Sequence, residues 1–404
     1  MKEQVINIFA AYKFDSNYYN RDDLEKAIKN AIKNTQRRLQ KSVVKDIKLQ
    51  LIEQSGISSG NYVGDFVRES INRASFNIFE LSDREPNVTF ELGYSMGISN
   101  FRYSNKNGYD ILIQNEKVSY RDVISDLLGR FITTYEYDTN AKHNKRYLTL
   151  QKKIEDELQT KIKDLIQDEK FLKNIVWRLQ GEKVYVICPY IPPEDQKKYG
   201  VQSAFSEYGD FNTVHEICIF LRGILQCEVE YFHSMKAKEV KDLLDNHLVV
   251  VGGPMWNDYT NKLMKDYKLP FQYKCQEGEE DYILNEINNK EYRVSKTRKN
   301  GREMITGDYG IFAVLPNKEN EDKTVILISG IRSFGGLGAT RSFTEGTIPY
   351  ENCKLIVKTV GLKNYFATLI EIDVPWGEFP YPKKIKQSDT FAYSPEEKLW
   401  KVIV

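Results

Sequence analysis

One acidic residue, Glu91, occupies a position in the sequence from which it could take part in catalysis. The apolar stretch 76–81 predicts a buried strand, and a helix opens directly after it with Asn87 as its N-cap. Glu91 falls just over one turn into that helix. Ligands of open α/β sheets bind at the carboxyl ends of the strands. We therefore expect Glu91 to lie beside a bound molecule.

A carboxylate at this place suits the cleavage of a glycosidic bond. Such a bond breaks through an oxocarbenium-like sugar cation. A nearby carboxylate can stabilise that cation, bind the ribose hydroxyls or attack the anomeric carbon. The structural alternative is that Glu91 only complements the dipole at the N-terminal end of its helix, and its spacing alone favours this alternative.

The motif around Glu91 favours the catalytic interpretation over the structural one. Asn87-Val88-x-Phe90-Glu91-Leu92-Gly93-Tyr94, preceded by the apolar strand and Asp83, resembles two related groups. One comprises the Toll/interleukin-1-receptor-like (TIR-like) domains of bacterial defence proteins, and the other is the nucleoside 2-deoxyribosyltransferase-like family. The resemblance covers roughly residues 5–140 and implies a flavodoxin-like sheet. It implies that Glu91 is the catalytic glutamate, a nucleophile in the transferase-like family and a ribose contact for NAD+ in the TIR-like family.

The resemblance also implies a substrate pocket around Glu91. The end of the first strand and the loop after it would cover the base or the ribose, and the residues near Glu91 would border the same pocket. For Ala10 and Ala11, simple packing at the strand end is an equal alternative. The implied substrate-binding residues are Ala10, Ala11, Tyr12, Phe14, Asp83, Asn87 and Tyr94.

Strands that alternate with helices predict an α/β protein. We expect a flavodoxin-like, TIR-like or deoxyribosyltransferase-like catalytic domain over residues 1–142. Apolar residues that recur every four positions predict a helical connector over 143–180, with an oligomerisation surface as the alternative. A second, Rossmann-like α/β domain, for sensing or oligomerisation, is expected over 181–404. Within it we expect one or two strands over 354–374 and an irregular tail beyond Trp376.

Two glycine-containing turns follow apolar strands in the second half. Their backbone N–H groups can bind a phosphate or another anion, so they predict a ligand site. Tight strand–helix packing is an equal alternative. The residues of this expected site are Gly252, Gly253, Asn257, Gly335 and Gly336.

Composition excludes several classes of protein. The formal net charge is +1 over 404 residues, which argues against direct nucleic-acid binding. Five cysteines without a C-x-x-C pair argue against disulfides and a metal site and indicate the cytoplasm. No stretch approaches the length of a membrane span, and no signal-peptide pattern opens the chain.

Three interpretations of function follow. The first is an NAD+ hydrolase that releases nicotinamide, without a cofactor, as an effector in bacterial antiphage defence. Its C-terminal domain would bind a signal ligand or a protein partner, and the chain would form a homo-oligomer. The second is a nucleoside or nucleotide deoxyribosyltransferase or hydrolase that releases a purine or pyrimidine. The third is a non-enzymatic nucleotide-binding signalling module in which Glu91 only contacts ribose.

Overall fold

The chain divides into two compact units: unit 1, Met1–Phe171, and unit 2, Leu172–Val404. No helix in the described part of the chain is long and apolar enough to cross a membrane. The computed structural model describes residues 4–40, 47–52, 63–102, 109–118, 132–137, 147–179, 181–192, 195, 208–240, 242–274, 280–299, 301–344, 346–361, 365–375 and 379–403.

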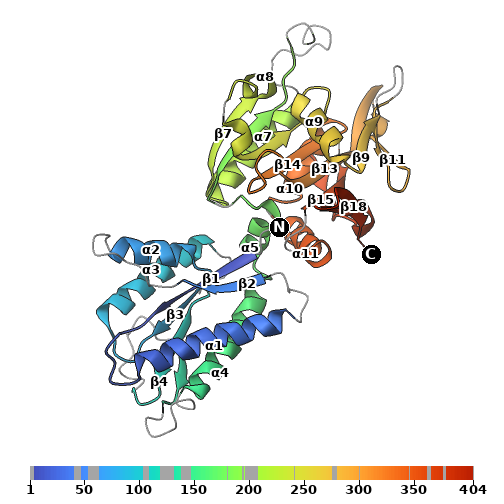
Figure 1. The fold of residues 1–404 in the computed structure, drawn as a ribbon. Coiled ribbons are helices and arrows are strands. Elements are labelled where there is room, and N and C mark those ends of the chain that lie inside the picture. Colours follow the sequence, from blue (N-terminus) through green and yellow to red (C-terminus); the bar gives the residue numbers. More distant parts are fainter. Residues whose placement is uncertain are drawn as a thin grey trace. The chain divides into compact units, whose positions relative to one another are not determined.

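Unit 1 is built on a five-stranded sheet with the order β2-β1-β3-β4-β5 (Figure 1). Every neighbouring pair is parallel. This is the flavodoxin-like order, and the predicted α/β class is confirmed. The strands are β1 (Gln4–Ala11), β2 (Ile47–Leu51), β3 (Phe76–Glu80), β4 (Ile111–Asn115) and β5 (Ile132–Tyr135). The helices are α1 (Arg21–Leu39), α2 (Val63–Arg73), α3 (Pro86–Arg102), α4 (Leu148–Leu165) and the start of α5 (Glu169–Trp177).

Helices cover both faces of this sheet. The pair α1 and α4 packs on one face, and α2 and α3 pack on the other (Figure 1). The start of α1 is set by Asn20, whose side chain accepts hydrogen bonds from the backbone N–H groups of Asp22 and Asp23. The rings of Phe9, Phe76 and Phe79 are fully buried, so the sheet has an apolar core.

Helix α4 belongs to unit 1, although we predicted a connector for residues 143–180. Its buried Glu155 accepts a hydrogen bond from Asn34 Nδ2 of α1 at 2.7 Å, and Glu157 accepts one from Thr133 Oγ1 of β5 at 2.8 Å. The apolar stripe that suggested a connector covers α1 and the sheet. The division between the units falls instead within α5.

Unit 2 has a larger, mixed sheet. Its main path runs β18-β17-β15-β13-β14-β8-β6-β7, with β12 paired to β13 and β16 paired to β15. The strands are β6 (Lys183–Cys188), β7 (Glu228–His233), β8 (His247–Val251), β12 (Ser295–Lys299), β13 (Arg302–Pro316), β14 (Thr324–Gly330), β15 (Tyr365–Asp373), β16 (Tyr381–Pro382), β17 (Thr390–Ser394) and β18 (Leu399–Val402), and a separate small sheet holds β9 (Phe271–Lys274), β10 (Tyr282–Asn285) and β11 (Lys290–Arg293). The helices are α7 (Tyr208–Gly223), α8 (Ser234–Ala237), η3 (Leu243–Asp245), α9 (Asp258–Tyr267), α10 (Ser333–Arg341), α11 (Thr347–Thr359) and η5 (Gln387–Asp389).

Only part of this sheet follows the predicted Rossmann-like pattern. Strands β14, β8, β6 and β7 are parallel to one another, whereas β13, β15, β17 and β18 pair in antiparallel fashion. Residues 354–374 hold the end of α11 as well as β15. The expectation of an irregular tail was wrong, because β17 pairs with β15 and buries Phe391.

Candidate active site

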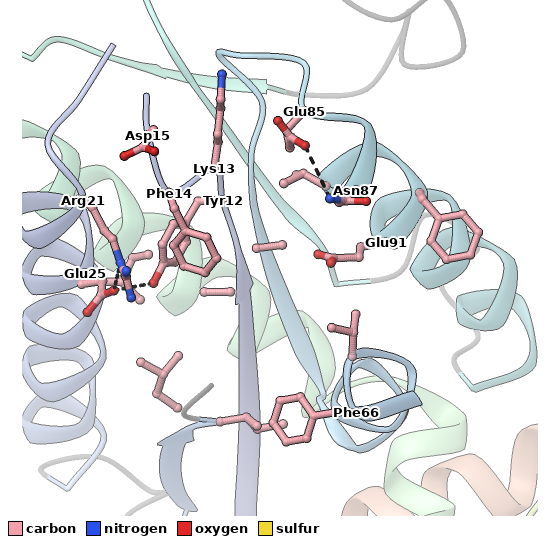
Figure 2. Close-up of a pocket in the computed structure, with 18 of the residues that line it drawn as sticks. Tyr12, Lys13, Phe14, Asp15, Arg21, Glu25, Phe66, Glu85, Asn87 and Glu91 are labelled. Atoms are coloured by element: carbon pink, nitrogen blue, oxygen red, sulfur yellow. Dashed lines mark hydrogen bonds and ion pairs between the residues drawn. The ribbon is translucent and has the colours of Figure 1, made fainter. Parts of the chain in front are cut away.

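A cavity of about 940 Å³ opens at the carboxyl ends of β1 and β2. In this strand order, β1 and β3 flank the point where the chain reverses its direction across the sheet, which is where such folds bind ligands. The cavity is lined by the end of β1 and the loop after it, by α1 and the end of β2, and by α2 and α3 (Figure 2). These are residues 10–15, 21, 25, 28–29, 51–52, 64, 66–67, 85, 87–88 and 90–91.

Glu91 is a half-buried residue of α3 that lines this cavity. Figure 2 shows it across the cavity from Tyr12 and Phe14. Within the described residues, its carboxylate forms no hydrogen bond or ion pair. Burial raises its pKa to about 7, because desolvation penalises the charged form and no cation compensates for it. A carboxylate with this pKa can stabilise a cation or exchange a proton near neutral pH.

The opposite wall is a connected aromatic and charged cluster. Tyr12 Oη donates to Glu25 Oε1 at 2.8 Å, and Arg21 Nε donates to the same oxygen at 2.8 Å. The guanidinium of Arg21 lies 4.3 Å from the centre of the Phe14 ring, and Tyr12 meets that ring edge-on at 6.0 Å. The Phe14 side chain is still 53% exposed. It therefore presents aromatic surface to the cavity.

Three other predicted substrate residues also line the cavity. Ala10 and Ala11 are buried in β1, and their small side chains leave room at the strand end. Asn87 lines the cavity from α3, but it is not the N-cap that we predicted, because the helix begins at Pro86. The Glu85 carbonyl accepts the hydrogen bond from the Thr89 N–H at 3.0 Å.

Two predicted substrate residues lie outside the cavity lining. Asp83 accepts hydrogen bonds from Ser16 Oγ and, at 3.4 Å, from Lys13 Nζ. It anchors the loop after β1 and does not face the cavity. Tyr94 exchanges hydrogen bonds with the exposed side chain of Asn72 on α2, at 3.0 and 3.2 Å, and so links α2 to α3. Neither residue lines this cavity, and their implied role as substrate contacts stays a prediction.

The buried carboxyl group of Glu80 stabilises the carboxyl edge of the sheet next to the cavity. Glu80 ends β3 and accepts hydrogen bonds from Tyr135 Oη at 3.0 Å, from the Ser82 N–H at 3.2 Å and from Ser82 Oγ. Burial raises the pKa of Glu80 to about 7, and these hydrogen bonds oppose the rise. Asn115 Nδ2 then donates to the Tyr18 carbonyl at 3.0 Å. The sheet edge thus holds the loop after β1 through polar side chains.

Sequence reasoning missed most of the α1 side of the cavity. Arg21, Glu25 and Lys29 line it at intervals of four residues. The intervals are visible in the sequence, but the helical pattern alone does not show that this charged side borders a cavity. Phe66 of α2 and Phe90 of α3 also line the cavity, and Phe90 is 66% exposed.

Three of the five residues predicted as a ligand site in unit 2 lie in the turn after β8, where Gly252 and Asn257 have structural roles. Gly252 adopts a φ of +98°, and a Cβ there would lie 3.0 Å from Pro189 Cβ, while a Cβ on Gly253 would come to 3.8 Å from the Gly330 carbonyl. Asn257 is buried and caps α9, and its Nδ2 donates to the carbonyls of Val251 at 2.8 Å and Ile187 at 3.2 Å. Close packing against Pro189 and the capping of α9 thus account for Gly252 and Asn257.

The second glycine turn already binds a carboxyl group of the protein itself. Gly335 and Gly336 lie buried in the first turns of α10, and the Gly335 N–H donates to Asp308 Oδ2 at 2.6 Å. The Arg332 N–H donates to the same oxygen at 3.2 Å, and the Tyr309 N–H donates to Asp308 Oδ1 at 2.8 Å. Burial raises the pKa of Asp308 to about 7, against these hydrogen bonds. The expected anion site is therefore filled.

Unit 2 has a smaller cavity of about 300 Å³ elsewhere, between the end of β6, α7 and β7. Two buried thiols, Cys188 and Cys218, contribute to its lining, and exposed rings of Phe211 and Tyr231 border it. Burial raises the pKa of Cys188 to about 12, so that thiol is not a nucleophile at neutral pH. In the described residues, no group of three or more His, Cys, Asp or Glu side chains is placed to hold a metal ion.

Fold and cavity together define an α/β protein with a ligand-sized site at the switch point of its first sheet. No family model matches the chain, and no curated protein matches it.

Proposed function

We propose that unit 1 hydrolyses the N-glycosidic bond of a nucleotide with a cationic pyridinium base, NAD+ in particular, and that Glu91 is its catalytic residue. One observation carries this proposal: a half-buried carboxylate without a partner among the described residues lines a cavity at the switch point. Such a group is suited to a site where positive charge develops on a sugar. The resemblance to TIR-like domains supports the same choice.

The charged state of the base decides between substrates. A neutral purine or pyrimidine is a poor leaving group unless an acid protonates it, whereas a pyridinium base leaves as a neutral molecule. Glu25, on the opposite wall, is held as a carboxylate by its hydrogen bonds to Tyr12 and Arg21, which lower its pKa against the effect of burial. It is therefore a poor proton donor. With Glu91 as the carboxylate that stabilises the sugar cation, the site matches a substrate whose base needs no protonation.

The reaction then balances simply. Water attacks C1′ of the ribose, the bond from C1′ to the pyridinium nitrogen breaks, and its electron pair returns to that nitrogen. Glu91 stabilises the positive charge on the sugar and takes the proton of the attacking water. NAD+ and water thus give nicotinamide, ADP-ribose and one proton.

The proposal extends to the biological setting through the resemblance. We place the chain among effectors of bacterial antiphage defence, with unit 2 as the controlling unit and a homo-oligomer as the active form. The exposed ring of Phe90, next to Glu91 in the sequence, offers an apolar contact for another protein surface. That surface would cover the mouth of the cavity in the active form.

The test is the identity of the released base. The purified full chain is incubated with NAD+, nucleosides and nucleotides, and the products are identified by mass. We expect nicotinamide from NAD+, with Glu91→Gln lowering kcat about a thousandfold. Glu69→Gln, an exposed change on the neighbouring helix α2, is the matched control. Release of a purine or pyrimidine from nucleosides would favour the deoxyribosyltransferase-like alternative. Wild type that leaves every compound intact would favour the non-enzymatic nucleotide-binding module.

A further inference from the structure

Helix α1 presents a row of three charges to the cavity. Arg21, Glu25 and Lys29 lie four residues apart, so the row is about 12 Å long. Glu25 is the central member: Arg21 Nε donates to it at 2.8 Å, and the positive charges of both Arg21 and Lys29 help to lower its pKa. Two cations share one carboxylate, so this wall carries a net charge of +1.

The facing wall has the opposite sign. Glu85 and Glu91 line the cavity from the start of α3, and none of the described residues that α2 and α3 contribute to it is basic. Two further charges, Lys13 and Asp15, come from the loop after β1 and offset each other. Lys13 is also paired with Asp83 at 3.4 Å. The cavity is thus positive along α1 and negative along α3.

Arg21 is held ready to receive an anion. Its bond to Glu25 fixes Nε, and its guanidinium lies over the Phe14 ring at 4.3 Å. The side chain is still 50% exposed. A planar guanidinium with a fixed orientation recognises phosphate oxygens in pairs, and little conformational entropy is lost when the orientation is set in advance.

We propose that Arg21 and Lys29 bind the phosphate on the substrate's ribose, so that the site selects phosphorylated N-ribosides over unphosphorylated ones. This inference rests on the proposed function, because it assigns the cationic base to the Glu91 side of the cavity. A pyridinium nucleotide carries a positive ring at C1′ of its ribose and a negative phosphate at C5′. The two walls match that order of charges.

The test measures binding, which needs no turnover. Two probes, nicotinamide riboside and nicotinamide mononucleotide, differ by one phosphate and are titrated calorimetrically into full-length Glu91→Gln protein. We expect the mononucleotide to bind at least about tenfold tighter, as befits hydrogen bonds to a charged group. Adding Arg21→Gln and Lys29→Gln should abolish this preference and leave the riboside Kd unchanged, which also shows that the protein is folded.

A control variant removes an equal charge from the same helix. Arg37→Gln lies about 12 Å beyond Lys29 along α1 and outside the cavity lining, so it should retain the preference. Equal affinity for the two probes, no detectable binding of either, or an equal loss with Arg37→Gln would overturn the inference. Failure of the proposed function looks different: the mononucleotide is preferred in these titrations, yet wild type releases no base.

Discussion

Replacing Glu91 by glutamine should stabilise unit 1 at high pH and not at low pH. In the folded protein, burial raises the pKa of Glu91 from 4.5 to about 7. Between these two values, the folded protein keeps a proton on Glu91 that the unfolded chain has lost. The free energy of unfolding of the wild type therefore falls as the pH rises through this window, and the loss is complete above about pH 7. Glutamine does not ionise and escapes this loss.

The size of the effect follows from the same pKa. A difference of one pKa unit corresponds to about 1.4 kcal/mol, so the rise of Glu91 sets an upper limit of about 3 kcal/mol. Because Glu91 is only half-buried, solvent screening reduces this to about 1–2 kcal/mol. For a unit of this size, the variant should melt about 2–8 °C above wild type at pH 8. At pH 4 the two proteins should melt together.

The assay has an internal control. All four tryptophans, Trp177, Trp256, Trp376 and Trp400, belong to unit 2, so tryptophan fluorescence follows that unit. Hydrogen exchange of the α3 amides follows unit 1. The pH-dependent gain should appear in α3 and be absent from the fluorescence transition. A Glu91→Gln advantage that is the same at pH 5 and pH 8 would refute the reasoning, because it would mean that the Glu91 carboxylate is solvated or paired.

Two further predictions concern Asp83, which anchors the loop after β1, and Gly335, which is closely packed in α10. Asp83→Ala should loosen the loop after β1, raise KM for the nucleotide about tenfold and change kcat less. Asp83→Asn should have a weaker effect because it keeps an acceptor for Ser16. An unchanged KM in steady-state kinetics would count against this anchoring role. Gly335→Ala should destabilise unit 2 by about 1–3 kcal/mol, because its Cβ would overlap the Tyr309 carbonyl. Gly336→Ala should be neutral or stabilising, because the nearest neighbour of its Cβ would be 3.8 Å away. Denaturant titrations followed by tryptophan fluorescence test this pair, and equal losses would contradict the packing explanation.

The fold of unit 1 was predictable because its elements are long or strongly patterned. The buried strand before Asp83 and the helix that carries Glu91 were both placed by local apolar patterns. The strand β17 was not predictable in this way. It has five residues, and its stability comes from pairing with β15, including a contact of 2.8 Å between the hydroxyls of Thr368 and Thr390. Such a non-local contact leaves little mark on the local sequence.

The site was predictable where a side chain's direction follows from its element, and not elsewhere. The position of Glu91 on its helix correctly predicted a place at the sheet edge. Asp83 lies in a turn, where neighbouring side chains set its direction, and it turns toward Ser16. The glycines of α10 were ambiguous because close packing and anion binding both require a bare backbone. Only Asp308, 27 residues before Gly335, distinguishes the two.

The position of Asp308 has a consequence for the binding of anions by unit 2. In many nucleotide-binding sheets, the positive end of a helix is left for the phosphate of the ligand. Here a carboxyl group of β13 occupies that end of α10 permanently. The N–H groups of Arg332 and Gly335 already have an acceptor in the protein without a ligand, and a phosphate would have to displace Asp308 from them. The N-terminal end of α10 is therefore not open to a phosphate, although it has the glycines that such a site usually needs.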